Sequence, residues 1–293
     1  MTSGPAEVFD LGYRGYEGER TSRWSRRRAI WLDGIRISLG LGRGVGAKVA
    51  PWLLLGLALV PMVVLLVIAA FVDTSTADPD DFELPSYAEY VEWAIVPLGL
   101  FAAVVAPLLL CPDRRDGVLA LYAARPITPL DYVGARWAAF LTVALGAAWL
   151  PEALLFAWNA LDASDPGSYV ADELDVVPRF LAAGILVATV LTTLTLLIAS
   201  YSSRRAYAAV AMLAVVIVGA AVGGIAEENF SGTVSDAVSL ASVTQALVDA
   251  VRWIFADEVD RPVPGWVSTL WLIALTAALA GLLVRRTKRL VRG

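Results

Sequence analysis

Residues 51–72 read PWLLLGLALVPMVVLLVIAAFV, a stretch without a single charged side chain. A helix needs about 20 consecutive apolar residues to cross the hydrocarbon core of a bilayer. Lipid offers no hydrogen-bond partner to the backbone of an open strand, so a run of this length predicts a transmembrane helix. This segment therefore predicts a membrane protein.

Five further apolar runs of similar length follow, none containing lysine or arginine, over residues 94–111, 137–158, 180–199, 206–226 and 266–284. The 293-residue chain is 58% hydrophobic and 17% charged, whereas a soluble domain carries about 25% charged residues. We therefore expect an all-α membrane protein with six transmembrane helices. It divides into a cytoplasmic N-terminal segment over residues 1–50 and a six-helix transmembrane domain over residues 51–293.

The residue inventory excludes several kinds of chemistry. The chain has no histidine and one cysteine, Cys111, so it can form neither a Ser-His-Asp set nor an imidazole metal site nor an intrachain disulfide. It contains no Gly-Lys pair and therefore no phosphate-binding P-loop. We expect no catalytic residues, no metal and no cofactor in this chain, and no nucleic acid as a partner.

The basic residues predict the orientation of the chain in the cell membrane. Twenty of the 23 lysines and arginines lie in the N-terminal segment, the connections after the second and fourth apolar runs, and the tail. The other three are Arg179, Arg252 and Arg261, and the connections that hold them are rich in aspartate and glutamate. Cytoplasmic loops carry the excess of positive charge, so both termini are predicted to be cytoplasmic.

The N-terminal segment combines aromatic, aliphatic and basic residues. Trp24, Trp31 and Ile35 recur at near-helical spacing, with Arg27 and Arg28 between them. This pattern predicts an amphipathic interfacial helix on the inner membrane surface, with membrane lipid as its partner. The alternative is a basic tail that only fixes the topology. The glycine-rich residues 40–46 would allow the chain to turn into the first span.

The connection between the fifth and sixth spans is long and partly apolar. From residue 234 to residue 255 apolar side chains recur at helical intervals, but the charges between them make the segment too polar to cross the membrane alone. The pattern is consistent with short re-entrant helices or with surface helices on the outer side, and both interpretations stay open.

The connection after the second span is the most informative stretch for function. Residues 111–133 read CPDRRDGVLALYAARPITPLDYV. A proline ends the span, a charged cluster follows, and Gly117 precedes a short apolar helix that Arg125 and Pro126 end. The segment therefore predicts a short cytoplasmic helix that presents charges below the membrane. Read more simply, it is a topogenic loop whose charges keep it soluble.

This connection resembles the one in the membrane subunit, or permease, of ABC-2 type ABC transporters. In that family an acidic cluster, a glycine, an apolar turn and an Arg-Pro or Ser-Pro step follow the second span. The residues that fit are Asp113, Gly117, Leu119, Leu121, Arg125 and Pro126. Residues 10–18 (DLGYRGYEG) and 44–52 (GVGAKVAPW) look like an actinobacterial subgroup. The family often has glutamate where this chain has Asp113 and Asp116.

The resemblance implies a partnership. A second permease copy or a related permease would complete the pathway, and a separate ABC ATP-binding subunit would hold the ATP and Mg²⁺ and drive export. The ATPase-coupling helix would comprise Asp113, Arg114, Arg115, Asp116, Gly117, Leu119, Leu121, Tyr122, Arg125 and Pro126. The interfacial helix would make a second contact with the ATP-binding subunit.

The spans carry few polar residues that could face a cargo. The candidate pathway residues are Glu152, Thr189, Thr192 and Thr193. Glu152 could also reach the outer headgroups, and threonines in lipid commonly bond to backbone. So few charges favour an amphipathic or lipid-like substrate.

Two further features bear on packing and on the alternative functions. Gly219 and Gly223 form a GxxxG step in the fifth span, which favours close helix packing. Glu152 is the single acid well inside a run, which gives thin support to the alternative function, a stand-alone secondary transporter or channel. A membrane-embedded enzyme is disfavoured because histidine and clustered carboxylates are missing.

Overall fold

The computed structural model describes residues 22–73, 84–117, 127–229, 238, 240–257 and 263–292, and the regular secondary structure in these ranges is helical throughout. Six helical stretches in them are long and apolar enough to cross a membrane, so the predicted all-α architecture with six helices of membrane-spanning length is confirmed. The spans are α2 (Val45–Asp73), α3 (Tyr87–Val105) with α4 (Pro107–Arg115), α6 (Pro129–Asp162), α8 (Val176–Tyr201), α9 (Arg205–Asn229) and α12 (Gly265–Arg292). Three more helices are α1 (Arg23–Ser38), α7 (Pro166–Asp172) and α11 (Val243–Phe255).

The helices extend beyond the apolar runs because polar residues cap them. Ser86 and Glu89 form a capping box that starts α3 well before the apolar run at residue 94. Thr128 and Asp131 form a second box that starts α6 before residue 137. The second span is also interrupted, since α3 ends at Val105 and α4 begins at Pro107, which lacks a backbone donor.

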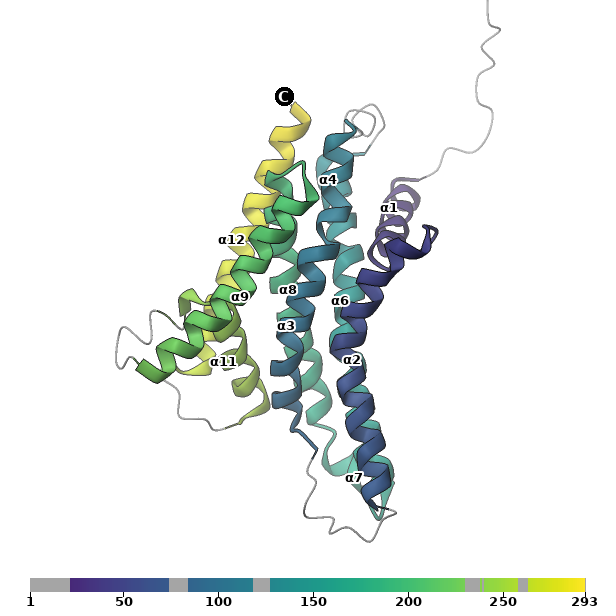
Figure 1. The fold of residues 1–293 in the computed structure, drawn as a ribbon, viewed down its shortest axis with the longest axis vertical. Coiled ribbons are helices and arrows are strands. Elements are labelled where there is room, and N and C mark those ends of the chain that lie inside the picture. The colour runs from purple at the N-terminus through teal and green to yellow at the C-terminus, as the bar shows by residue number, and fades with distance from the viewer. Residues whose placement is uncertain are drawn as a thin grey trace, which may run out of the picture.

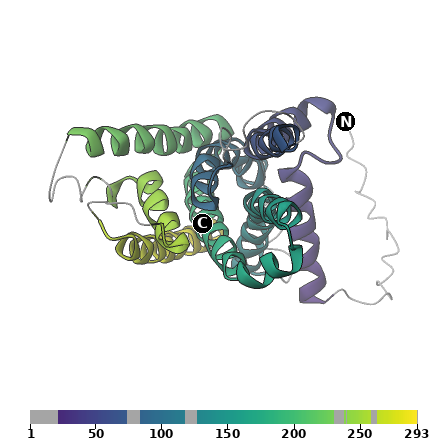
Figure 2. The same ribbon diagram turned by 90° about the horizontal axis from the view of Figure 1, so that it is seen from below.

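The spans form a bundle around α3, α6 and α8 (Figure 1). On one side α2 packs against α3 and α6. On the other side α9 and α11 pack against α3 and α8, and α12 packs against α8 and α11 (Figures 1 and 2). The rings of Phe101 and Phe140 stack in the centre of the bundle with centroids 5.5 Å apart. α3 and α8 are largely buried, whereas α2, α9 and α12 expose most of their apolar side chains.

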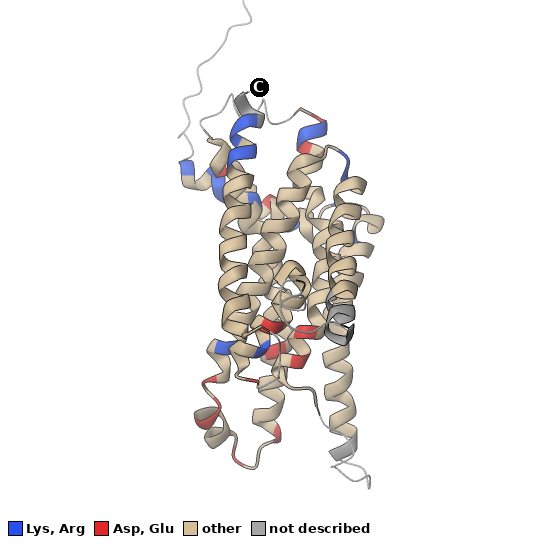
Figure 3. Ribbon diagram, turned by 90° about the vertical axis from the view of Figure 1, so that its left-hand side faces the viewer, with Lys and Arg blue, Asp and Glu red and all other residues tan. Residues whose placement is uncertain are grey.

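Charge separates to the two ends of the bundle (Figure 3). Lysine and arginine gather at the end that holds α1, the last turn of α4, the first turn of α6 and the C-terminus of α12, here called the basic end. Aspartate and glutamate predominate at the other end, which holds α7 and the start of α3, here called the acidic end.

At the basic end α1 lies across the bundle. In Figure 2, which looks along the axes of the spans, α1 runs across the direction of view. It approaches α6 closely at Gly34, where an added Cβ would lie 2.5 Å from the Cβ of Ala139. The chain then turns into α2 through Gly40, whose φ of +64° favours glycine, and the indole of Trp52 donates to the Leu39 carbonyl at 3.1 Å.

Near the middle of α2, a tyrosine from α3 enters the backbone hydrogen-bond pattern. Pro61 offers no N–H. On the next residue the N–H of Met62 donates to the Tyr90 hydroxyl at 3.3 Å, and that hydroxyl donates to the Ala58 carbonyl at 2.6 Å. Tyr90 therefore joins α3 to α2 through two buried hydrogen bonds.

α11 packs against four of the spans, α3, α8, α9 and α12. Arg252 on its last turn binds Glu92 of α3 through two guanidinium nitrogens, one of them 2.8 Å from the carboxylate. These hydrogen bonds to the Glu92 carboxylate raise the pKa of Arg252 above its ordinary value, because they stabilise the charged guanidinium. The start of the predicted helical pattern, residues 234–237, lies outside the described residues.

Candidate functional site

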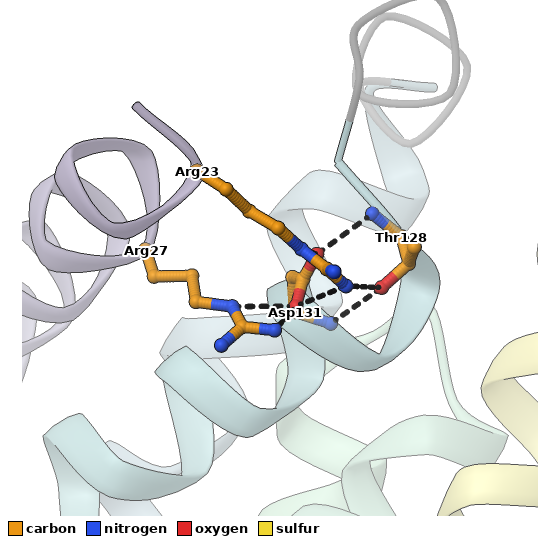
Figure 4. A network of polar contacts seen from close by, with 4 residues as sticks. All are labelled: Arg23, Arg27, Thr128 and Asp131. Carbon is orange, nitrogen blue, oxygen red and sulfur yellow. Dashed lines mark hydrogen bonds and ion pairs between the residues drawn. The ribbon is translucent and has the colours of Figure 1, made fainter. Parts of the chain in front are cut away.

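Asp131 stands at the start of α6 and binds two arginines of α1 (Figure 4). Its carboxylate completes the capping box by accepting from the Thr128 N–H at 3.1 Å. The same carboxylate accepts from Arg23 at 2.8 Å and from Arg27. The Asp131 side chain is 1% exposed, so these contacts offset the cost of burying its charge. One residue thus both begins α6 and fixes the N-terminal half of α1 on it.

Arg136, less than two turns further along α6, joins three elements. Its side chain is 3% exposed, with one terminal nitrogen 2.8 Å from Asp33 of α1 and the other 3.1 Å from Asp113 of α4. The hydroxyl of Tyr132 also donates to Asp113, at 2.5 Å. The Arg136 network, defined as Asp33, Asp113, Tyr132 and Arg136, therefore links α1, α4 and α6 at the basic end.

Arg114 ties the same end of α4 to α8. Its guanidinium donates to the Ser200 carbonyl at 2.5 Å, in the last turn of α8, where a positive charge is favourable because of the helix dipole. The thiol of Cys111 donates weakly to the neighbouring Ala199 carbonyl at 3.7 Å. The segment that leads into the 118–126 connection is therefore held from two sides, by α6 and by α8.

The structure describes only some of the predicted coupling residues. Asp113 and Arg114 are held as above, and Arg115 pairs with Asp116 at 3.7 Å on an exposed surface, where such a pair contributes little stability. Gly117 follows the end of α4. Five predicted residues lie outside the described ranges: Leu119, Leu121, Tyr122, Arg125 and Pro126.

The predicted interfacial residues all lie on α1. Trp24 is 71% exposed and Arg28 is exposed, while Arg27, Trp31 and Ile35 are half-buried. The indole of Trp31 donates to Thr142 of α6 at 3.2 Å. The buried face of α1 is formed by Ile30, Gly34 and Ser38. Arg27 and Trp31 thus reach toward α6, and Trp24 and Arg28 lie exposed beside that contact.

The candidate pathway residues do not gather into one polar site. Glu152 is 1% exposed, and its two oxygens have no hydrogen-bond partner in the part of the chain that the structure describes. Thr193 donates to the Thr189 carbonyl at 2.8 Å and accepts from the Trp137 indole at 3.0 Å. Thr192 is buried, and its hydroxyl finds no partner among the described residues.

The GxxxG step lies on α9 at the contact with α11. The Gly219 carbonyl accepts a 2.8 Å hydrogen bond from Ser242, the N-cap of α11. An added Cβ on Gly219 would meet the hydroxyls of Ser242 and Thr244 at 3.4 Å. Gly223 lies one turn further along α9, beyond the described side chains.

Sequence reasoning counted Arg136 only as a topogenic charge and missed Asp33, Tyr132 and Asp131 altogether. Thr128 and Asp131 do carry a local signal, because Thr-Pro-Leu-Asp is a capping-box pattern with proline at the first helical position. Asp33 and Arg136 stand 103 residues apart, and no local pattern indicates that they meet.

Comparisons with known proteins add no assignment: no family model matches the chain, and no relative was found among curated proteins. Within the described residues no group of three or more cysteine, aspartate or glutamate side chains is placed to hold a metal ion. The arrangement at the basic end can act mechanically, because charged and hydrogen-bonded contacts connect the end of α4 with α1, α6 and α8.

Proposed function

We propose that this chain is the membrane-spanning permease subunit of an ABC-2 type ABC transporter, multi-pass in the cell membrane with both termini cytoplasmic. It would form the pathway for ATP-driven export of an amphipathic or lipid-like substrate. A second permease, identical or related, and a separate ATP-binding subunit complete the assembly. The resemblance of residues 111–126 to the coupling segment of that family, together with the charge bias of the loops, supports this assignment.

The observation that carries the proposal is the Arg136 network. A nucleotide-driven subunit can shift a membrane protein between two states only if its contacts differ in free energy between them. A docked segment must therefore be joined firmly to the spans. Asp113 at the root of the proposed coupling segment is bound by Arg136 of α6, and Arg136 also holds α1 through Asp33. Force applied below the membrane then moves α1, α4 and α6 as one body.

The test is purification of the tagged full-length chain from its own host membranes in mild detergent, followed by identification of bound proteins. We expect a P-loop ATP-binding subunit to co-purify. Replacement of residues 114–122 by a neutral flexible linker of equal length should release it. The matched control replaces α7 (Pro166–Asp172) in the same way at the acidic end and should leave the subunit bound.

Two results would overturn the proposal. One is that the 114–122 variant retains the ATP-binding subunit and that its ATP turnover still responds to cargo. The other is that the purified chain alone, reconstituted in vesicles, moves solute in response to an ion gradient.

Glu152 favours the second candidate function, a stand-alone secondary transporter or channel. A charged side chain in mid-span costs about 2.5–3.5 kcal/mol on insertion scales, so such residues commonly serve ion coupling. Vesicle transport by a Glu152→Gln variant separates the two functions, with the exposed Glu173→Gln as control. In an ATP-driven permease, both variants should still depend on ATP for transport, whatever the effect of Glu152→Gln on the rate. In a gradient-driven carrier, transport driven by the ion gradient should be lost in Glu152→Gln alone.

A further inference from the structure

A groove of about 880 Å³ lies between α1 and α6 at the basic end. Its α1 wall carries three arginines and two tryptophans on one helix face, because residues 23, 24, 27, 28 and 31 fall one turn apart in pairs. Its α6 wall becomes apolar away from the capping box, through Gly134 and Ala138. The volume falls within the ~300–1,000 Å³ of ordinary ligand sites. The groove is therefore basic at its mouth and apolar along α6.

The charges in the groove do not cancel. Arg23, Arg27 and Arg28 face a single carboxylate, Asp131, which leaves a net charge of +2. Asp131 is already shared by Arg23 and Arg27 (Figure 4). Arg28 has no ion pair or hydrogen bond to any other residue that the structure describes. The mouth of the groove thus holds a guanidinium whose charge an anionic ligand would balance.

Exposed apolar surface adjoins these charges. Trp24 is 71% and Leu130 is 43% exposed, although both line the groove. An added Cβ on Gly134 would meet no protein atom within 4 Å, so the α6 wall is open at this point. A ligand that fits must therefore present an anion and a long apolar chain together.

We propose that this groove binds one anionic phospholipid of the inner leaflet. Its phosphate lies against Arg28 and the Arg23–Arg27 pair, and an acyl chain runs along α6 past Gly134 and Ala138. Basic pockets beside transmembrane helices select anionic headgroups by this chemistry. The proposal rests on the membrane placement of α1 and does not require the transporter assignment, so each can fail without the other.

The test uses the purified full-length chain in detergent, titrated with phosphatidylglycerol or phosphatidylcholine and read by native mass spectrometry. The wild type should bind phosphatidylglycerol in preference. Arg28→Gln should weaken that binding about fivefold, the effect of losing one basic side chain near an anionic lipid surface. Gly134→Leu should abolish the preference, because leucine occupies the path of the acyl chain while meeting open space.

Two control variants separate the groove from general effects. Gly146→Leu fills a second open position on α6 away from the groove, and Arg43→Gln removes an exposed charge from the α1–α2 turn. Both should bind phosphatidylglycerol like the wild type, and thermal unfolding midpoints show whether any variant misfolds.

Three results would overturn the proposal. The first is equal binding of the two lipids by the wild type. The second is loss of binding in Arg43→Gln to the same extent as in Arg28→Gln, which indicates non-specific surface attraction. The third is unchanged lipid binding in Gly134→Leu combined with loss of a co-purifying ATP-binding subunit, which makes the groove a protein-docking surface.

Discussion

Replacement of Arg136 with leucine should destabilise the chain by about 3 kcal/mol, and the estimate follows from the burial of its partners. The Arg136 side chain is 3% exposed and that of Asp113 is 19% exposed, whereas that of Asp33 is 56% exposed. Removing one partner of a buried ion pair costs about 3–5 kcal/mol, because the other charge is left uncompensated. Water can hydrate Asp33 once Arg136 is removed. Loss of the Arg136–Asp33 pair should therefore cost only as much as loss of a surface ion pair, about 0–1 kcal/mol.

The assay is thermal unfolding of the purified chain in detergent, followed by tryptophan fluorescence. At about 2–4 °C per kcal/mol, the midpoint of Arg136→Leu should fall by roughly 6–12 °C. The double variant with Asp113→Asn should lose less than the sum of the single variants, since no unpaired carboxylate then remains on α4. The matched control is Arg115→Gln, whose exposed pair with Asp116 contributes little.

A midpoint for Arg136→Leu within the error of the control would refute the reasoning. So would strictly additive effects of Arg136→Leu and Asp113→Asn. Either result would mean that α1, α4 and α6 are held together by their apolar contacts and not by the Arg136 network.

Three further substitutions test other contacts. Glu92→Gln should release the end of α11, at a cost of about 1–3 kcal/mol for a charged hydrogen bond to Arg252, and hydrogen exchange of the α11 amides should speed up. Gly34→Leu should displace α1 by collision with Ala139, costing about 1–3 kcal/mol, and cross-linking between α1 and α6 should drop. Tyr90→Phe should leave buried α2 backbone groups unpaired, at about 1–3 kcal/mol, seen as a lower unfolding midpoint.

Each of these substitutions has a matched control. Asp257→Asn removes the longer, exposed contact of Arg252 at 3.4 Å and should leave α11 protected. Gly44→Leu meets no atom within 4 Å and should keep the α1–α6 cross-link. Tyr207→Phe alters an exposed tyrosine and should unfold like the wild type. If a control and its test variant behave alike, the contact in question contributes nothing measurable.

The spans could be predicted from sequence because membrane insertion depends on a local property, the length of an apolar run. Their ends could not be placed by the same property, because Glu89 and Asp131 continue the helices as capping residues into polar sequence. The interruption at Pro107 is equally local, but many prolines stay inside helices, as Pro97 and Pro151 do here. Apolar length therefore predicts that a helix crosses, and capping decides where it starts.

The site at the basic end was only half predictable for a different reason. The charge count identified where arginines gather, since the positive-inside bias is a sum over loops. It could not tell Arg115, which is exposed, from Arg136, which is buried between two carboxylates. That difference depends on α1 folding back onto α6, and the close approach at Gly34 that permits it involves residues more than 100 positions apart.

The second span carries an arginine–carboxylate ion pair near each end of the bundle. Near its start Glu92 is bound by Arg252 of α11, and at its end Asp113 is bound by Arg136 of α6. Between them the helix is interrupted at Pro107, and proline is a common position for a sharp kink in a helix. A displacement imposed on Asp113 from below would reach α1 and α6 directly through Arg136. It would reach α11 only through the interruption, so we expect the basic end to move as a rigid unit and the acidic end to follow with a smaller displacement.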